Sequence, residues 1–389
     1  MVGVKSDRRA QRTFRSIRLV FLVLFLATST VLGILHLFSP GTKPVGVDAL
    51  DPFGGIESAF TLIATGSMLS KIAWSSFILL FATLASAIVF RRVFCGNVCA
   101  FGALQELFGK LGKVIFRKQF EISRVMDKPA RYLKYVLLVG IVAWSAIVGS
   151  LVIRPYDPWA AYHHLVSTEL ISGFLVGLAV LILSLVGSMF YDRFFCKYLC
   201  PMGGFLGLIN RIGWFRVKRN DATCTHCMAC DKACPVNIKV ESMEQVQSSE
   251  CINCNLCVNA CPVKDTLVIG GPRTTKGKVS SLAVVGITLG IFVAVLGGTT
   301  AAGLVNWTVA PLAEAVTATQ SALNPDDIKG SDTFAQVSTL SGIAKEEFLA
   351  RFKISAEDFE KPIKDAAHRP GSVFDTQAVR DFVKEGLGK

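Results

Sequence analysis

Long apolar stretches separated by polar segments dominate the chain up to about residue 304. A membrane-spanning helix needs roughly 20 apolar residues. The stretches that reach this length are 17–38, 72–90, 133–153, 170–191 and 279–304. We therefore predict an all-α integral membrane bundle of five spans. The first stretch is too long for the apolar part of a signal peptide and no small-residue cleavage site follows it, so we expect it to be retained.

Beyond the last span the pattern changes to that of a small helical domain, residues 318–389. Its apolar residues recur at spacings of three and four, which is typical of amphipathic helices; they are Phe334, Val337, Leu340, Ile343, Phe348, Leu349 and Phe352. We expect four short helices, a capping box at Ser355–Asp358 and a C-cap at Gly386. The segment has no cysteine and one histidine, His368, so we expect no haem, cluster or covalent flavin there. Docking, oligomerisation and simple stabilisation remain alternative roles.

Composition supports the membrane prediction and adds an orientation. The chain of 389 residues is 51% hydrophobic and only 18% charged, with a mean hydropathy of +0.48. Lysine and arginine concentrate in 91–134 and 192–278, whereas 39–71 and 154–169 contain few. Since cytoplasmic segments carry the excess of basic residues, we expect the N-terminus to lie inside and the C-terminal domain outside. The net charge of +12 then reflects topology, and no nucleic-acid partner is expected.

All twelve cysteines fall into four clusters. These are 95/99, 196/200, 224/227/230/234 and 251/254/257/261. None lies in a predicted span or in the predicted outer segments, where an oxidising compartment would favour disulfides. The cysteines are therefore expected to be metal ligands or redox groups.

Two of these clusters have the spacing of a bacterial ferredoxin. Residues 224–235 read CTHCMACDKACP and residues 251–262 read CINCNLCVNACP. In such runs three cysteines hold one cubane and the fourth ligates the other cluster. The predicted ligand sets are Cys224, Cys227, Cys230 and Cys261 for one [4Fe–4S] cluster, and Cys251, Cys254, Cys257 and Cys234 for the second. Structural zinc is the alternative, and His226 is expected to tune a cluster by hydrogen bonding.

The remaining cysteines belong to an internal repeat. Segment 92–112, RVFCGNVCAFGALQELFGKLG, matches 193–213, RFFCKYLCPMGGFLGLINRIG, and the Asp-Pro-aromatic triplet recurs at 51–53 and 157–159. Two parallel two-span repeats, related by an axis along the membrane normal, explain both matches. The predicted division is a basic cytoplasmic N-terminus (1–16), membrane repeat 1 (17–132), membrane repeat 2 (133–217), a cytoplasmic ferredoxin module (218–270), the fifth span (279–304) and the outer domain (318–389).

Each repeat carries a C-x-x-x-C pair whose two thiols share a helical face. A two-fold axis would bring Cys95 and Cys99 together with Cys196 and Cys200. We hypothesise that these four bind a third iron–sulfur cluster between the halves. A pair of redox-active dithiols is the competing interpretation, and retention of small buried residues is a third.

The order of these motifs resembles that of NapH/NosR-type polytopic membrane ferredoxins over roughly residues 15–270. The resemblance implies a multi-pass electron-transfer protein of the bacterial inner membrane, with its C-terminal domain in the periplasm. Such a protein takes electrons from the membrane quinol pool and passes them to a periplasmic carrier or reductase. Two departures matter: Ala100 stands where the family has proline, although Pro201 is present, and no flavin-binding domain precedes the first span as it does in NosR. A redox assembly factor for a metalloenzyme, similar to FixG-type membrane ferredoxins, is the alternative function.

A quinol site requires aromatic side chains at membrane depth and groups that accept protons. The outer loops supply Asp51 in one half and Asp157, His163 and His164 in the other, with Glu57, Phe53, Trp159 and Tyr162 nearby. The predicted site consists of Asp51, Asp157, His163 and His164. The alternative location is the inner face beside Arg92 and Arg193, which we expect instead to anchor span ends at the lipid headgroups.

Overall fold

The computed structural model describes most of the chain, in two compact units. The described residues are 8–38, 43–44, 51–65, 74–117, 120, 122–148, 152–167, 169–271, 278–305, 308–309, 323, 325, 328, 330, 332–367, 374 and 376–386. Unit 1 comprises Met1–Leu37 and Gly46–Asn306, and unit 2 comprises Phe38–Val45 and Trp307–Lys389. Each unit is considered by itself below.

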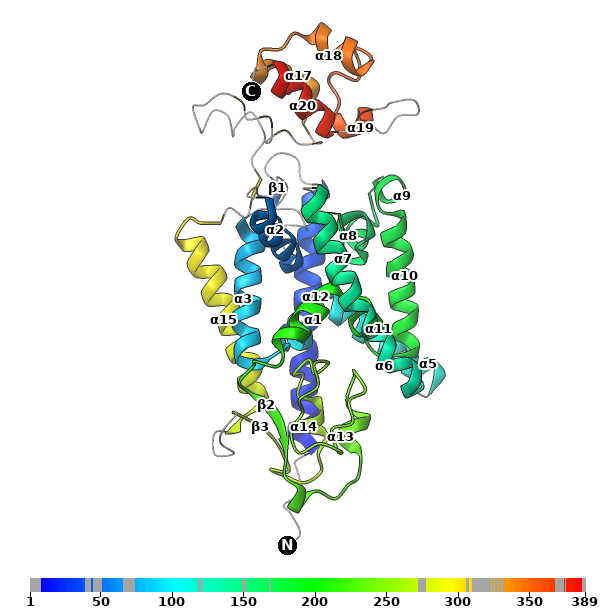
Figure 1. Cartoon of the computed structure of the whole chain (residues 1–389), viewed down its shortest axis with the longest axis vertical. Helices are drawn as coiled ribbons and strands as arrows, with labels where there is room; N and C mark the ends of the chain where they lie inside the picture. Colours follow the sequence, from blue (N-terminus) through cyan, green and yellow to red (C-terminus); the bar gives the residue numbers. More distant parts are fainter. Residues whose placement is uncertain are drawn as a thin grey trace. The chain divides into compact units, whose positions relative to one another are not determined.

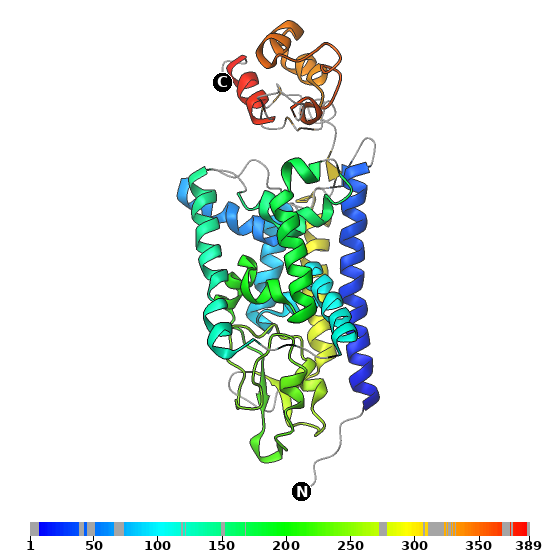
Figure 2. The same ribbon diagram turned by 90° about the vertical axis from the view of Figure 1, so that its right-hand side faces the viewer.

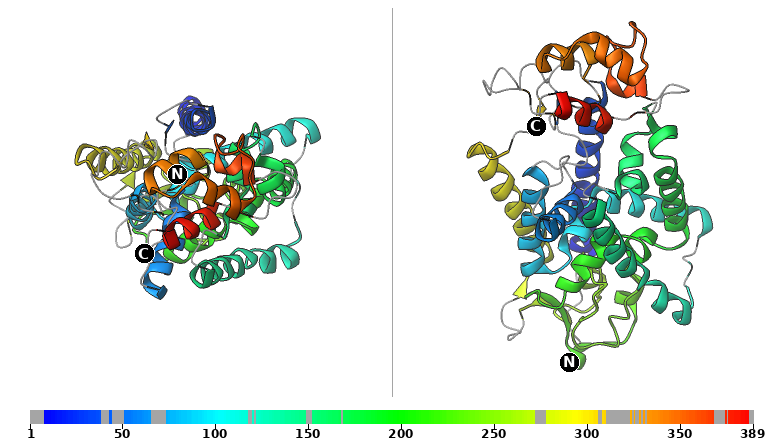
Figure 3. Two further views of the ribbon diagram at one scale, coloured as in Figure 1. Left: turned by 90° about the horizontal axis from the view of Figure 1, so that it is seen from above. Right: turned by 45° about the horizontal axis from the view of Figure 1, so that its top comes forward.

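Unit 1 is built around long helices that run side by side (Figures 1 and 2). These are α1 (Arg8–Phe38), α3 (Trp74–Phe90), α7 (Leu133–Val148), α10 (Leu175–Phe190) and α15 (Ser281–Ala301). Shorter helices occupy the ends: α2 (Pro52–Thr65), α4 (Val93–Asn97), α5 (Ala100–Phe116), α6 (Arg124–Ala130), η2 (Arg154–Tyr156), α8 (Pro158–His163), α9 (Glu169–Gly173), α11 (Phe194–Tyr198) and α12 (Pro201–Ile209). Seen from above, α1, α7 and α15 lie at the periphery of this unit (Figure 3, left).

Three stretches in the described residues are long and apolar enough to cross a membrane, namely Gln11–Phe38, Val125–Val148 and Ser281–Ala301. They coincide with the first, third and fifth predicted spans. The helices at the other two predicted spans are shorter, at 17 residues for α3 and 16 for α10. At 1.5 Å per residue these reach only about 24–26 Å, less than the roughly 30 Å of a hydrocarbon core. In α10 the cause is a break at Phe174, which separates α9 from the main helix.

The long helices are apolar outside and polar inside. In α10, Ser184 and Ser188 are fully buried, whereas the side chain of Ile182 is 55% exposed. In α3, Thr83 is fully buried and Phe81 is 63% exposed. Small hydroxyl residues at helix contacts and large apolar residues on the outer surface are typical of helices packed in lipid. The long helices are therefore suited to a membrane.

One end of unit 1 carries a small module with the two ferredoxin runs. Strands β2 (Arg216–Arg219), β3 (Leu267–Gly270) and β4 (Lys278–Val279) form an antiparallel sheet in the order β2-β3-β4. Val217 lies opposite Ile269 in this sheet. The runs pass through the short helices α13 (Ala229–Lys232) and α14 (Leu256–Ala260), with η3 (Asp221–Thr223) before the first. The described part of unit 1 is thus mostly helical, and its one sheet consists of short strands.

Unit 2 has its own aromatic core. Its helices in the described residues are α17 (Phe334–Ser341), α18 (Lys345–Phe352), α19 (Ile363–Ala367) and α20 (Thr376–Gly386), and strand β1 (Lys43–Pro44) pairs with β5 (Thr308–Val309). Phe334 and Phe348 are fully buried within it. The capping box lies at Thr333 and Gln336, at the start of α17. The expected box at Ser355–Asp358 is wrong, because Ser355 Oγ accepts from the Asp358 N–H (3.3 Å) in a turn that no helix follows. His368 lies outside the described residues.

Candidate metal centres

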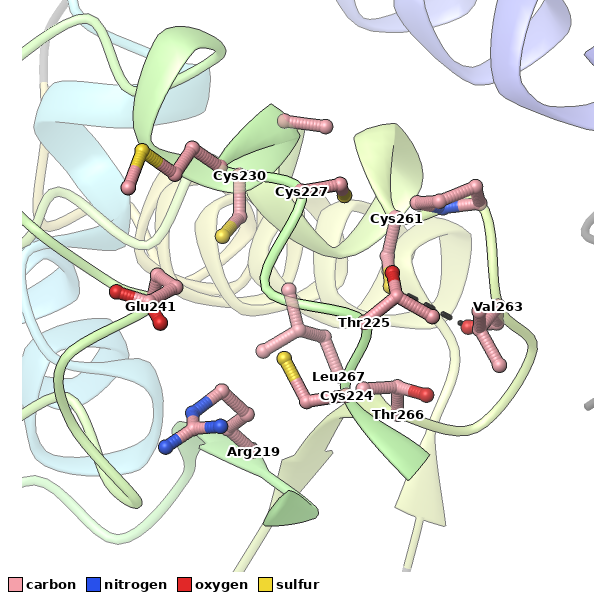
Figure 4. A pocket seen from close by; sticks show the side chains of 13 residues that line it. Arg219, Cys224, Thr225, Cys227, Cys230, Glu241, Cys261, Val263, Thr266 and Leu267 are labelled. Atoms are coloured by element: carbon pink, nitrogen blue, oxygen red, sulfur yellow. Dashed lines mark hydrogen bonds between the residues drawn. The ribbon is translucent and has the colours of Figure 1, made fainter. Parts of the chain in front are cut away.

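The structure brings four cysteines of the ferredoxin module together around one cavity. Cys224, Cys227 and Cys230 come from the first run, and Cys261 comes from the end of the second. Figure 4 shows their side chains around the cavity, with Arg219 and Glu241 on its wall. Four thiols surrounding a cavity, three from one run and one from the other, fit the ligand set that a cubane needs.

A second cavity has the complementary set of cysteines. Cys234 from the first run meets Cys251, Cys254 and Cys257 from the second. Apolar side chains complete its wall, among them Val217 and Ile252. Within the residues that the structure describes, no group of three or more histidine, cysteine or carboxylate side chains is close enough together to hold a single metal ion. The crossing of the fourth cysteine between runs is the pattern that the sequence predicts.

The two runs follow the same backbone path. The second and fourth residues after the first cysteine have left-handed φ angles in both: 48° at His226 and 57° at Met228, then 46° at Asn253 and 59° at Asn255. This region is uncommon for residues other than glycine, and asparagine tolerates it better than methionine. The His226 ring is 58% exposed, and its Nδ1 lies 2.5 Å from Glu241 Oε1.

Burial raises the pKa of several thiols around the two cavities. The pKa of Cys230 rises to about 11 and that of Cys234 to about 12, with neighbouring thiols adding to the effect for Cys234. The pKa of Cys257 is also raised, first by burial and then by other cysteines that include Cys230 of the first set. These groups are therefore protonated thiols in the absence of metal, and they would lose their protons on binding a metal centre, whose positive charge compensates the buried thiolates. The influence of Cys230 on Cys257 also indicates that the two sets are neighbours.

The two C-x-x-x-C segments have the same local structure. Each forms a five-residue helix, α4 or α11, and its second cysteine then caps the next helix. The Sγ of Cys99 accepts from the Gly102 N–H (3.3 Å), and the Sγ of Cys200 accepts from the Gly203 N–H (3.2 Å). The Cys99 and Cys200 N–H groups donate to the carbonyls of Phe94 and Phe195, both at 2.9 Å.

All four C-x-x-x-C thiols influence one another. Burial, followed by Cys196 and Cys95, raises the pKa of Cys99 to about 12. Burial also raises the pKa of Cys200 well above its ordinary value, and Cys196, Cys95 and Cys99 contribute. Gln105 Nε2 donates to the Cys196 Sγ at 3.2 Å. The structure therefore brings together the four cysteines that the repeat pairs.

Arg92 and Arg193 lie inside the protein, so the expectation that they anchor span ends at lipid headgroups is wrong. Their side chains are 1% and 0% exposed. Arg193 donates to the Cys95 carbonyl and pairs with Glu106 at 3.0 Å, while Arg92 Nη1 donates to the Ser249 carbonyl at 2.9 Å. Each arginine reaches the helix that follows the other C-x-x-x-C segment, because a glycine leaves room there. A Cβ on Gly102 would lie 2.9 Å from Arg193 Nη1, and one on Gly203 would lie 2.8 Å from Arg92 Nη2. The two buried arginines therefore place positive charge beside the C-x-x-x-C thiols.

The second ferredoxin set packs directly on the first C-x-x-x-C segment. A Cβ on Gly96 would lie 2.3 Å from the Ile252 carbonyl oxygen and 3.2 Å from the Cys254 nitrogen. Asn253 Nδ2 donates to the Phe90 carbonyl at 2.7 Å, and Asn210 Nδ2 donates to the Cys251 carbonyl at 3.2 Å. The sequence analysis missed Gly96, Asn210 and Asn253. Of these three, only Gly96 could have been recognised from the sequence, because a glycine inside a cysteine motif indicates that another backbone segment approaches closely.

The aspartates of the predicted quinol site begin helices. Asp51 Oδ1 accepts from the Phe53 N–H at 3.0 Å. The two Asp157 oxygens accept from the Trp159 and Ala160 N–H groups at 3.2 and 3.0 Å. Their carboxylates thus act as N-caps of α2 and α8.

The histidines lie at the other end of α8. His163 is buried beneath Trp159, and its Nε2 is 3.4 Å from Ser29 Oγ on α1. Burial lowers its pKa to about 4. His164 stacks on Phe174 with ring centroids 4.3 Å apart, so the two imidazoles contact different neighbours.

Glu57 is a further buried titratable group at this end of the unit. Its side chain is fully buried in α2, and Oε1 accepts from Ser145 Oγ at 2.5 Å. Oε2 has no hydrogen-bond partner among the residues that the structure describes. Burial raises the pKa of this carboxyl to about 8.

Comparison with family models matches both kinds of cysteine motif. A 4Fe-4S binding domain matches twice, at residues 72–119 and 174–220, which contain the two C-x-x-x-C segments. A 4Fe-4S dicluster domain matches residues 216–262, which contain both ferredoxin runs.

Several curated relatives share these motifs. The electron transport protein YccM of Escherichia coli strain K12 is 30% identical over 270 residues, covering 67% of this chain and 75% of that protein. The ferredoxin-type protein NapH of the same strain is 28% identical over 49% of this chain and 61% of its own length. The regulatory protein NosR of Pseudomonas aeruginosa is 31% identical over 41% of this chain and 22% of its own length. No solved structure matches the chain.

Proposed function

This chain belongs to the NapH/NosR-type family of ferredoxin-like membrane electron transport proteins, and from that premise we propose that it oxidises quinol and passes the electrons towards a periplasmic reductase. Electron transfer through iron–sulfur clusters is common to the family. The quinol, its site and the direction of transfer are the parts that this proposal adds.

The observation that carries the proposal is the sequence of three adjacent cysteine groups in unit 1. Cys224, Cys227, Cys230 and Cys261 hold the first cluster, with Cys227 exposed at the surface. Cys234, Cys251, Cys254 and Cys257 hold the second, against Gly96 of the first C-x-x-x-C segment. Cys95, Cys99, Cys196 and Cys200 hold a third. Each cluster takes one electron, so electrons can pass from group to group.

The proposed architecture is five spans in two parallel repeats, with the boundaries expected from the sequence. The double match of one family model and the equal local structure of the two C-x-x-x-C segments support it. In this arrangement the ferredoxin module and the N-terminus are cytoplasmic, and unit 2 is periplasmic, where it docks an electron carrier or reductase.

The quinol site lies at the outer ends of the two repeats. Oxidation of one quinol releases two electrons and two protons. His163 is uncharged at neutral pH because burial lowers its pKa, so a ring nitrogen is available to accept a proton. His164 lies beside it, and Asp51 and Asp157 hold the starts of the helices that carry the site.

Anaerobic reduction by quinol tests the proposal. The protein, purified without oxygen and placed in liposomes, is mixed with menadiol, and bleaching of the iron–sulfur absorbance is followed. We expect reduction of the wild type and at least tenfold slower reduction of His163→Gln, with reduction by dithionite unchanged. The matched control is His36→Gln at the end of α1, which should behave like the wild type. Clusters that dithionite reduces and menadiol leaves oxidised would contradict quinol oxidation and favour the assembly role.

A further inference from the structure

A cavity of about 470 Å³ lies where the membrane helices meet the ferredoxin module. Arg15 and Arg18 of α1 and Lys110 and Lys113 of α5 line one side of it. Asp192 and Arg193, which follow α10, and residues of α13 and α14 complete the wall. These elements gather at the same end of unit 1 in Figures 1 and 2. The volume is within the range of ordinary ligand sites.

The charge of the lining is strongly positive. Its basic residues are Arg15, Arg18, Lys110, Lys113, Arg193 and Lys232, and its acidic residues are Glu106 and Asp192.

Both carboxylates are already paired with cations of the wall. Glu106 accepts from Arg18 at 2.9 Å and from Arg193 at 3.0 Å, and Asp192 pairs with Lys113 at 2.5 Å. Lys110 is 4.0 Å from Glu106, at the limit of an ion pair. Burial lowers the pKa of Lys110; Glu106 partly opposes this effect, and the charges of Arg18, Lys113 and Arg15 add to it. An anion in the cavity would relieve this repulsion.

The remaining wall is apolar and consists of Pro235, Leu256 and three alanines that lie beside cluster ligands. Ala229 precedes Cys230, Ala233 precedes Cys234 and Ala260 precedes Cys261. A bound anion would therefore contact the short helices that carry ligands of both ferredoxin sets.

The exposed surface of α5 indicates which kind of anion can reach the cavity. Leu111, Val114 and Ile115 on this helix are 47%, 76% and 55% exposed, next to the two lysines that line the cavity. A helix with exposed apolar residues beside lysines is typical of the membrane interface, where apolar side chains enter the lipid and lysines reach the headgroups. Basic pockets between membrane helices are also known to suit acidic headgroups.

We propose that this cavity binds the phosphate headgroup of an anionic phospholipid. The lipid phosphate lies among the cations that the two carboxylates leave uncompensated, and it connects α1 and α5 to the ferredoxin module. This inference concerns a lipid site and stands independently of quinol oxidation.

The test is titration of delipidated, cluster-loaded protein in detergent with a short-chain phosphatidylglycerol, followed by native mass spectrometry. The variant is Arg15→Gln with Lys232→Gln, since both side chains are exposed and can be changed without emptying a buried ion pair. We expect its apparent Kd for the lipid to rise roughly thirtyfold. The matched control is Arg12→Gln with Lys264→Gln, which removes one exposed cation from α1 and one from the module but none from the cavity.

Iron content measured in parallel shows that the variants are folded. Unchanged affinity in the control, with phosphatidylcholine binding weakly to all forms, supports the proposal. Equal affinity of the variant, the control and the wild type for phosphatidylglycerol would overturn it. Binding of inorganic phosphate or ADP that displaces the lipid and is lost in the variant would overturn the lipid as the occupant and assign the site to a soluble phosphate.

Discussion

Glu57 and His163 stand six residues after the two aspartates that begin α2 and α8. The Asp-Pro-aromatic triplet aligns the sequences of the two helices, so these buried side chains occupy equivalent positions in α2 and α8. Burial favours the uncharged form of each side chain: it raises the pKa of Glu57 and lowers the pKa of His163. At neutral pH both are therefore expected to be neutral, which leaves His163 able to accept a proton in the proposed reaction.

The raised pKa of Glu57 makes a pH-dependent prediction. A carboxyl whose folded pKa is about 8 stabilises the fold below its ordinary value of 4.5, and this contribution is lost as the pH rises through 8. Glu57→Gln removes this pH-dependent loss of stability. The melting temperature of the variant minus that of the wild type should therefore increase from pH 5 to pH 8.5. The exposed Glu244→Gln is the control, and a pH-independent difference for Glu57→Gln would show that Glu57 is ionised in the folded protein.

Gly96 provides a test of the contact between the C-x-x-x-C segment and the module. Since an added Cβ would approach the Ile252 carbonyl to 2.3 Å, Gly96→Ala must move the second cluster loop. We expect a loss of about 1–3 kcal/mol in stability and a changed electron paramagnetic resonance spectrum of the reduced clusters. Gly290→Ala, where nothing lies within 4 Å of the new methyl group, should leave the spectrum unchanged. A wild-type spectrum in Gly96→Ala would refute the close approach.

At the scale of elements, α7 is joined to the module by a buried ion pair. Lys134 Nζ lies 2.5 Å from Glu250 Oε1, and Arg92 approaches the same carboxylate to 3.5 Å. The side chains of Lys134 and Arg92 are 0% and 1% exposed. This carboxylate therefore links a membrane helix, the loop before the second ferredoxin run and the first C-x-x-x-C segment.

Removing that carboxylate should be costly because two buried cations would lose their partner. We expect Glu250→Gln to destabilise the protein by about 3–5 kcal/mol, measured as thermal loss of cluster absorbance in detergent. The double variant Lys134→Met with Glu250→Leu should regain much of this stability, since it also removes one of the stranded charges. Glu250→Gln melting like the wild type would mean that the pair contributes nothing.

Sequence predicted those elements whose chemistry is local. The ferredoxin runs could be paired with their ligand sets because bonds to a cubane dictate the spacing of the cysteines. The break at Phe174 that shortens α10 could not be predicted, since it depends on how the chain packs around α8 and α9. The inward course of Arg92 and Arg193 was missed for the same reason: their partners are distant in sequence.

At the scale of the whole molecule, the cysteine groups form a continuous series within unit 1. The first ferredoxin set influences the second, and the second packs on Gly96 between Cys95 and Cys99. The thiols of the two C-x-x-x-C segments come next, with the buried arginine that precedes each segment beside them. A third metal centre at this junction would connect the module to the membrane helices electronically as well as structurally.

The number of metal centres is the most direct test of this account. Iron and acid-labile sulfide are counted per chain in anaerobically purified wild type and in Cys95→Ser with Cys196→Ser. Three cubanes contain about twelve irons and two contain about eight. The account predicts about twelve in the wild type and about eight in the variant, whereas about eight in both would contradict the third centre and leave the C-x-x-x-C pairs as thiols.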